Sequence, residues 1–446
     1  MNHEEKVAAI AAQIRSRPRG SGPASLRKSA VSHFVPNPND PKHGDRKIDV
    51  RALDQILELD IPARRCVVEP GVTFSDLVRA TLAHRLVPKL VPELKTITVG
   101  GAIAGCSVES MSYRYGGFHD SCRSYELVTG TGEILRCSPG DNSLLFEMIH
   151  GSYGTLGILT RVEFDLIPAM PYVHMDYRRL RSFADFHSVM MKLCEEGRYD
   201  FIDGIIHGRD SFVLCLGQFT DRAPWTSDYK SLNIFYKSTA TRRDDYPTTY
   251  DYFFRYDTEC HWLTRSLPVP AMESLPMRLL LGKVLLGSTN ILNWSRRLRP
   301  LLKHQKNVDV VVDVFIPEPR VKEFYGWYEA TLDYFPLWIV PYRAPKVYPW
   351  IDEDHAKANS SAYFIDCAVY GKKNDVPGVD YHKLLEDKTR ELGGIKTLIS
   401  QNQYDEATFW KIYHRDNYDR AKRISDPDGM FRGLYEKFHP TAPGSR

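Results

Sequence analysis

The sequence predicts an α+β protein with two domains. The chain has 446 residues, which exceeds the usual size of one domain. Strand-like and helix-like segments occur in both halves, and their pattern changes just beyond Pro168 and Pro171. We therefore expect a first domain at residues 1–171, a second domain at residues 172–415 built on a multi-stranded sheet, and a C-terminal segment at residues 416–446 that returns to the first domain.

The composition is that of a soluble globular protein. The chain is 43% apolar and 26% charged, and its aromatic content of 12% suits a protein that encloses a flat or apolar molecule. A net charge of +3 gives no sign of a nucleic-acid partner. Eight cysteines occur without a CxxC or zinc-like pattern, so we expect free thiols, no metal site and a reducing, cytoplasmic location. The N-terminus lacks a signal-peptide pattern and no apolar run is long enough to span a membrane, so no transmembrane segment is expected.

The first domain is expected to begin with a helix at residues 4–15, which Pro18 ends. Thr73, followed by Asp76 three residues later, is the expected N-cap of a helix at residues 73–86. The other elements predicted here are a strand at 66–70, a β-hairpin at 124–138, a short helix at 142–150 and a strand at 158–168.

The second domain is expected to open with a β-hairpin at residues 201–219. Residues 418–438, in the C-terminal segment, indicate a helix, a DPDG turn and another helix. The other predicted elements are strands at 308–317, 336–343, 361–371 and 395–400, and helices at 320–335, 380–392 and 405–414.

Residues 151–157, GSYGTLG, have the glycine spacing of a nucleotide-binding loop. A dinucleotide fingerprint needs the order strand, loop, helix, whereas here the order is helix, loop, strand. A Walker loop would need Gly-Lys-Ser/Thr, which is absent. Taken alone, the stretch favours a tight loop before a strand.

Two further loops of small residues change that interpretation. Gly100, Gly101, Ala102 and Gly105 follow a β-patterned segment, and residues 17–25, RPRGSGPAS, add two arginines to a Gly-Ser-Gly turn. Missing side chains let backbone N–H groups approach an anion or the edge of a flat ring. Three such loops in the first third of the chain therefore indicate one elongated ligand.

The sequence resembles the flavoproteins of the vanillyl-alcohol-oxidase type, and within them the delta-24-sterol reductases, the diminuto-like enzymes. The similarity is carried by VEPGVTFSDLV, by residues 88–165 and by FPLWIVPYR, YFIDCAVYG and EATFWKIY. It implies an FAD-binding domain of two subdomains with an α+β substrate cap domain on an antiparallel sheet. It also implies reduction of an isolated C=C bond in a sterol-like or other isoprenoid lipid, with NADPH as electron donor.

The resemblance also implies which residues hold the FAD. The stretch from Thr98 to Ser110 would be the strand and loop that embrace the diphosphate and ribityl, residues 154–158 a second backbone clamp, and residues 17–25 a diphosphate loop. Relatives that bind flavin covalently carry a His in the diphosphate loop; none is present here, which implies non-covalent FAD. The implied residues are Arg19, Gly20, Ser21, Gly22, Thr98, Val99, Gly100, Gly101, Ala102, Gly105, Cys106, Ser107, Ser110, Gly154, Thr155, Gly157 and Ile158.

Reduction of an unpolarised alkene needs an acid, because hydride addition alone would leave an unstabilised carbanion. Glu109 follows the flavin loop and is one candidate; its alternative is a helix N-terminal or ribityl-binding carboxylate. His119 is placed near flavin by the resemblance, and its alternative is a structural loop histidine. Asp366 and Tyr370 share one face of the predicted strand at 361–371, where a buried Asp could stay protonated; their alternative is a satisfied polar pair in the cap core.

Residues 275–306 combine many leucines with a basic cluster. They predict either a cap helix with a solvated basic face or a peripheral contact with anionic lipid. The eukaryotic reductases resemble membrane-anchored proteins through an N-terminal apolar segment, and this chain begins without one, which favours a soluble form.

Two other functions remain open at the level of sequence. The same fold could serve an FAD-dependent dehydrogenase or oxidase of an alcohol, amine or sugar, for which Glu109 or His119 would act as base. A lipid- or partner-binding module without cofactor is the third alternative.

Overall fold

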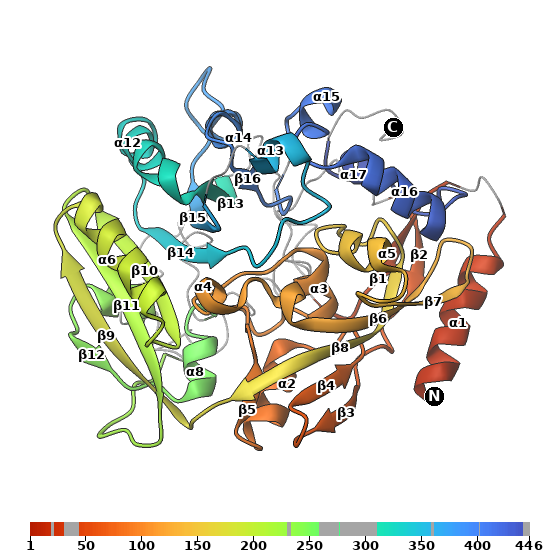
Figure 1. Ribbon diagram of the computed structural model, residues 1–446, viewed down its shortest axis with the longest axis horizontal. Coiled ribbons are helices and arrows are strands. Elements are labelled where there is room, and N and C mark those ends of the chain that lie inside the picture. The colour runs from red at the N-terminus through yellow and green to blue at the C-terminus, as the bar shows by residue number, and fades with distance from the viewer. Residues whose placement is uncertain are drawn as a thin grey trace.

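The computed structural model describes residues 1–18, 22–30, 44–229, 233–257, 276, 310–357, 361–400 and 402–439. Its strands form sheets of two, six and eight strands, and helices lie against both larger sheets (Figure 1). This confirms the α+β class and the antiparallel sheet of the cap. No helix in the described ranges combines the length and hydropathy needed to cross a bilayer.

The six-stranded sheet forms the framework of the N-terminal region. Its order is β3-β4-β8-β6-β7, with β5 also pairing β8, and every pair is antiparallel. Its strands are β3 (Ile56–Asp60), β4 (Arg65–Val68), β5 (Leu86–Pro88), β6 (Cys122–Val128), β7 (Ile134–Cys137) and β8 (Ile158–Pro168). The predicted hairpin and the long predicted strand are thus confirmed.

Short helices connect these strands. Thr73 caps α2 by accepting the backbone N–H of Asp76, as its spacing predicted. The helices of this region are α1 (His3–Arg15), α2 (Phe74–Leu82), α3 (Val99–Ala104), α4 (Ser112–Tyr115), the 3₁₀ helix η2 (Phe118–Ser121) and α5 (Ser143–Met148), beside a parallel pair β1 (Ala24–Arg27) and β2 (Arg46–Asp49).

The stretch that begins at Thr98 is a helix, so the expectation of a strand there was wrong. Thr98 caps α3 by accepting the backbone N–H of Gly101 at 3.3 Å. A Cβ on Gly100 would lie 2.7 Å from the Cβ of Pro70, so the bare backbone lets the helix start against that proline. Capping and this tertiary contact override the β propensity of the residues before it.

The eight-stranded sheet is antiparallel throughout and has the order β12-β9-β11-β10-β14-β15-β13-β16. The predicted strand at 395–400 is only two residues long, in β16. The strands are β9 (Tyr172–Leu180), β10 (Phe201–Gly208), β11 (Ser211–Thr220), β12 (Asp244–Asp245), β13 (Val310–Pro317), β14 (Leu337–Arg343), β15 (Tyr363–Lys372) and β16 (Ile395–Lys396).

The two faces of this sheet have different surroundings. On β15, Ile365, Cys367 and Val369 belong to the core that also contains residues of α6, α12 and α14. The alternate positions of β15, which include Asp366 and Tyr370, therefore point to the opposite face, toward the N-terminal region. The helices of the cap are α6 (Phe183–Glu196), α7 (Phe235–Thr239), α8 (Thr249–Phe253), η3 (Glu318–Arg320), α12 (Val321–Thr331), α13 (Glu353–Lys357) and α14 (Tyr381–Glu391).

The C-terminal helices lie beside the N-terminal region, as Figure 1 shows for α16 next to α5. Nζ of Lys422 in α16 donates to the backbone C=O of Thr155 at 2.7 Å and to that of Phe431 at 2.8 Å. The helices are α15 (Glu406–Phe409), shorter than expected, α16 (Arg415–Ser425) and α17 (Leu434–Phe438). The domain boundaries after residues 171 and 415 stay predictions.

Candidate active site

Two of the three predicted glycine loops meet in space. The backbone N–H of Tyr153 donates to the C=O of Ala104 at 3.0 Å, which joins the second loop to the end of α3. Gly105 and Cys106 from the first loop and Gly151 and Tyr153 from the second line one cavity. The arrangement places two backbone segments with few side chains on one wall.

The glycines of these loops serve different purposes. A Cβ on Gly154 would meet no atom within 4 Å, and one on Gly101 would meet only the hydroxyl of its own cap, Thr98, at 3.2 Å. A Cβ on Gly157 would lie 2.5 Å from Leu127, so that glycine, like Gly100, allows close packing within the protein. Gly101 and Gly154 thus keep space open beside the backbone, which fits a flat or phosphorylated cofactor.

The remaining predicted cofactor residues are spread more widely. Thr155 and Ser110 are buried; the Thr155 hydroxyl donates to the C=O of Ser152, and the Ser110 hydroxyl bonds Glu109 and Tyr252. Gly22 has a φ of +80° and lies in the N-terminal loop. Val99 and Ala102 are buried inside α3, Ser107 bonds the C=O of Ala102 through its N–H, and Ile158 is the first residue of β8. Arg19, Gly20 and Ser21 lie outside the described residues.

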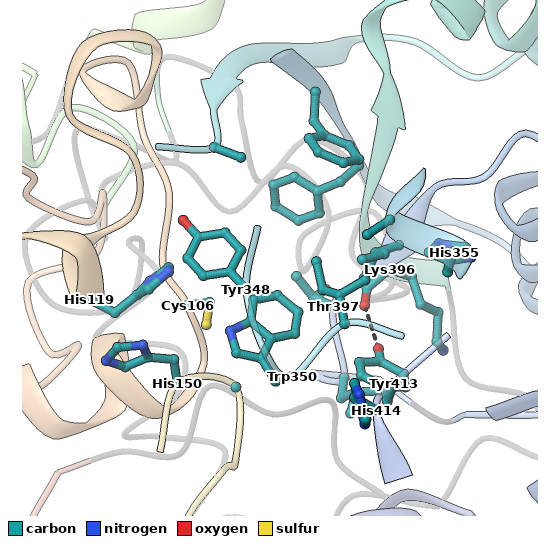
Figure 2. A pocket seen from close by; sticks show the side chains of 18 of the residues that line it. Cys106, His119, His150, Tyr348, Trp350, His355, Lys396, Thr397, Tyr413 and His414 are labelled. Atoms are coloured by element: carbon teal, nitrogen blue, oxygen red, sulfur yellow. Dashed lines mark hydrogen bonds between the residues drawn. The ribbon is translucent and has the colours of Figure 1, made fainter. Parts of the chain in front are cut away.

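The cavity lies between these loops, the cap sheet and the C-terminal region, and has a volume of about 350 Å³. This is the size range of small-molecule pockets. Figure 2 shows His119, His150 and Cys106 on one side, Tyr348 and Trp350 in the middle, and Thr397 and Tyr413 on the other. The aromatic lining residues are Tyr153, Phe315, Tyr342, Tyr348, Trp350, Phe364, Trp410, Tyr413 and Tyr418. The lining favours an apolar occupant.

His119 is a polar group within this lining. It is 2% exposed, and neither ring nitrogen makes a hydrogen bond to a described residue. Its ring lies 4.9 Å from that of His150 and 5.4 Å from that of Tyr348, centroid to centroid. Burial lowers the pKa of His119 to about 4, with electrostatic effects of the neighbouring His150 and Lys346 adding to the lowering and the charge of Asp120 opposing it. The imidazole is therefore neutral at pH 7, its Nε2 lies 3.4 Å from Oδ2 of Asp120, and it can hydrogen-bond an occupant of the cavity.

Glu109 lies in a buried ion-pair cluster. Its Oε1 is 2.7 Å from Nη2 of Arg255, which is also 3.2 Å from Oδ2 of Asp203. All three side chains are at most 3% exposed, and Trp338 Nε1 donates to Asp203 at 2.7 Å. The rings of Tyr252 and Tyr256 lie 4.2 and 4.7 Å from the guanidinium carbon. A carboxylate paired with a buried guanidinium is poorly suited to donate a proton, because the pair requires its charge.

Asp366 and Tyr370 lie on the cap face toward the N-terminal region, beside Asp313 of β13. The Tyr370 hydroxyl donates to Oδ1 of Asp313 at 2.5 Å. Asp366 is 2% exposed, and its Oδ1 has no hydrogen-bond partner among the described residues. Burial, followed by the charges of Asp313 and Glu93, raises the pKa of Asp366 well above its ordinary range. Burial and the neighbouring acids thus favour the protonated form of Asp366.

Four residues of these clusters were missed by sequence reasoning: Glu93, Asp203, Arg255 and Asp313. For the two aspartates a signal was present, because each interrupts an otherwise apolar strand in FIDGII and VVDVFI. Arg255 stands in a run of aromatic residues, which suggests burial but names no partner. The basic leucine-rich segment at 275–306 lies, apart from residue 276, outside the described residues.

Comparison with known proteins shows which proteins the chain is similar to. A family model described as FAD binding domain matches residues 5–138. The Delta(24)-sterol reductase of Homo sapiens is 26% identical over 413 residues, which cover 89% of this chain and 78% of that protein. The enzyme of Arabidopsis thaliana is 22% identical over 479 residues, covering 98% and 84% respectively. Cytokinin dehydrogenase 5 of Arabidopsis thaliana is 27% identical over 139 residues, covering 30% of this chain and 26% of that protein.

With the open glycine loops and the aromatic cavity, these matches define the class: the chain is an FAD-binding flavoprotein of the vanillyl-alcohol-oxidase type. Relatives named Delta(24)-sterol reductase match along about nine-tenths of the chain at 22–26% identity. The resemblance to the delta(24)-sterol reductases noted in the sequence is thereby confirmed.

Proposed function

We propose that the protein is an FAD-dependent oxidoreductase that uses NADPH to reduce an isolated C=C bond in the side chain of a sterol-like or other isoprenoid lipid. The observation that carries the proposal is the aromatic cavity between the cofactor loops and the cap sheet. Relatives that cover about nine-tenths of the chain bear the name Delta(24)-sterol reductase, which supports the same substrate class.

The chain's own residues would perform four tasks in this reaction. The open backbone at Gly101 and Gly154 accommodates the cofactor, and the absence of a histidine in residues 17–25 leaves it non-covalent. Bound FAD, once reduced by NADPH, would supply the hydride. The apolar walls exclude water, and aromatic faces such as those of Tyr348 and Trp350 stabilise positive charge that develops at the tertiary carbon. An acid of the protein supplies the proton.

The predicted candidates then separate by role. His119, neutral and facing the cavity, orients an occupant through a hydrogen bond. The pair of Glu109 and Arg255 holds the loop after α3 against β10, because Ile202 also donates its backbone N–H to the C=O of Ser110 at 2.9 Å. Asp366 and Tyr370 remain as the proton-handling candidates. The segment 275–306 is proposed as a peripheral lipid contact of a cytoplasmic protein.

Anaerobic mixing tests the function. NADPH should bleach the bound flavin, and a sterol with a trisubstituted double bond in its side chain should restore the colour of the reduced protein, whereas the saturated sterol should not. Bleaching by alcohols or sugars but not by NADPH would instead establish a dehydrogenase, a reaction for which the short match to a cytokinin dehydrogenase is the supporting observation. Protein that takes up no FAD would refute both.

A further inference from the structure

We propose that Glu93, Asp313, Asp366 and Tyr370 form one proton-sharing site at the edge of the cavity, in which Asp366 donates the proton to the alkene and the other three residues restore it. This inference rests on the proposed function and names the acid which that function requires. Glu93 comes from the loop before α3, and the other three residues come from the cap sheet.

The sheet register brings the cap residues together. β13 and β15 are antiparallel neighbours in which Asp313 pairs with Ala368 and Phe315 pairs with Asp366. Asp313 and Asp366 are therefore diagonal neighbours on one face, within reach of each other's charge. The hydroxyl of Tyr370 donates to Oδ1 of Asp313 at 2.5 Å, so a hydrogen bond connects these two residues of the group.

Asp366 stands next to the cavity lining. Phe364, two residues before it on the same face, lines the cavity, and so does Phe315, its partner across the strands. Tyr342, which pairs with Phe364 from the other neighbouring strand, lines it as well. Oδ1 of Asp366 is buried without a hydrogen-bond partner in the described part of the chain. Such surroundings favour the protonated carboxyl, because Oδ1 finds no donor among the described residues that would stabilise the anion.

Glu93 lies close enough for its charge to raise the pKa of Asp366. Burial raises the pKa of Glu93 to about 7; the charges of Glu109 and Asp313 add to the rise, and its own backbone N–H and Arg255 oppose it. Burial also raises the pKa of Asp313 to about 6, against hydrogen bonds from Tyr370 and Thr397. Three neighbouring carboxyls cannot all ionise, so the group holds protons at neutral pH and releases them in turn.

A metal ion is a poor alternative occupant. The described residues contain no group of three or more His, Cys, Asp or Glu side chains that could hold one. Arg255 is engaged by Glu109 and by Asp203 of β10, and it opposes the rise in the pKa of Glu93 only in part. We infer that shared protons compensate the charge of these carboxyls.

The step balances with groups already named. The π bond of the alkene breaks, and positive charge develops at its tertiary carbon. That carbon would receive the hydride, which reduced FAD supplies when it is bound and which NADPH provides. The other carbon gains the proton as the O–H bond of Asp366 breaks. Asp366 is left as a carboxylate and takes a new proton from Asp313 or Glu93, which recover theirs from water.

The test separates the two half-reactions in the FAD-loaded protein. Asp366→Asn is nearly isosteric and should keep its FAD and the wild-type rate of bleaching by NADPH. Reoxidation of the reduced protein by the alkene should slow by about 100-fold or more, the usual contribution of a general acid. Glu93→Gln and Asp313→Asn should slow it less and shift its pH profile, because they affect only the return of the proton. Asp333→Asn, which removes an exposed partner of Arg209, is the matched control and should react like the wild type.

A second measurement does not depend on turnover. Infrared difference spectra at pH 7 should show a protonated carboxylic acid in the wild type that Asp366→Asn removes. If the alkene fails to reoxidise even the wild type, the proposed function is wrong, while the infrared band still decides whether the group holds protons. Wild-type reoxidation rates in Asp366→Asn, or the absence of the band, would overturn the inference.

Discussion

Replacing Arg255 with methionine should destabilise the protein strongly. The guanidinium lies 2.7 Å from Glu109 and 3.2 Å from Asp203, and all three side chains are at most 3% exposed. Methionine fills similar apolar space against Tyr252 and Tyr256 but leaves two buried carboxylates without a cation. Removing one partner of a buried ion pair costs about 3–5 kcal/mol, and here both carboxylates share the lost partner, so we expect the upper part of that range.

The loss of stability in Arg255→Met should depend on pH. Burial already raises the pKa of Asp203 to about 6, against the charge of Arg255, and loss of that charge would raise it further. A carboxyl whose pKa is raised in the folded state contributes stability that is present below its unfolded pKa and lost as the pH rises through the folded value. The deficit of Arg255→Met should therefore be small near pH 5 and large at pH 8.

Urea unfolding followed by tryptophan fluorescence measures this effect. The triple variant Arg255→Met/Glu109→Gln/Asp203→Asn should recover most of the loss, because it removes the stranded charges together with their partner. Arg209→Met, which breaks an exposed pair with Asp333, is the control and should leave the urea midpoint unchanged. A single variant as stable as the wild type at pH 8, or a triple variant as unstable as the single one, would refute the reasoning.

Three further variants test the site. Gly101→Val should fold but lose FAD, measured by flavin absorbance after gel filtration. Gly140→Val, at a glycine whose added Cβ would meet no atom within 4 Å, should retain FAD; equal retention would remove Gly101 from the cofactor site. Glu93→Gln should abolish the part of the stability decline that the wild type shows between about pH 4.5 and 7, so that its urea midpoint gains on the wild type at pH 8; parallel pH curves would contradict the raised pKa. Lys422→Met should release the backbone at Thr155 and weaken FAD binding several-fold in a fluorescence titration, while unchanged affinity would mean that the loop needs no such support.

Local patterns predicted the parts of the fold that depend on local interactions. The cap of α2 at Thr73 and the hairpin of β6 and β7 involve residues close in sequence, so spacing was enough to find them. Alternation along β15 likewise placed Asp366 and Tyr370 on one face. The helix that begins at Val99 was missed, because its start depends on packing against a proline about 30 residues earlier in the chain, Pro70.

For each interaction in the candidate site, the sequence predicted one of the interacting residues but not its partner. Glu109 was singled out beside the cofactor loop, but its partner Arg255 lies far away in sequence and no local rule connects the two. Glu93 joins the aspartates of the cap only when the loop before α3 meets the sheet. Apolar neighbours in the sequence reveal a buried acid. Tertiary contacts, which the sequence does not show, decide whether that acid is ionised.

The hydrogen bonds from the C-terminal region to the second glycine loop, residues 151–157, bear on when the newly made chain can bind its cofactor. Lys422 bonds the backbone at Thr155, Lys437 bonds that at Tyr153, and the N–H of Ala24 donates to the C=O of Met430 at 2.7 Å. A nascent chain still emerging from the ribosome has glycine loops but lacks the segment that fixes them. We therefore expect stable cofactor capture only after the residues through Lys437 have been made, so newly made protein should pass through a colourless stage before it turns yellow.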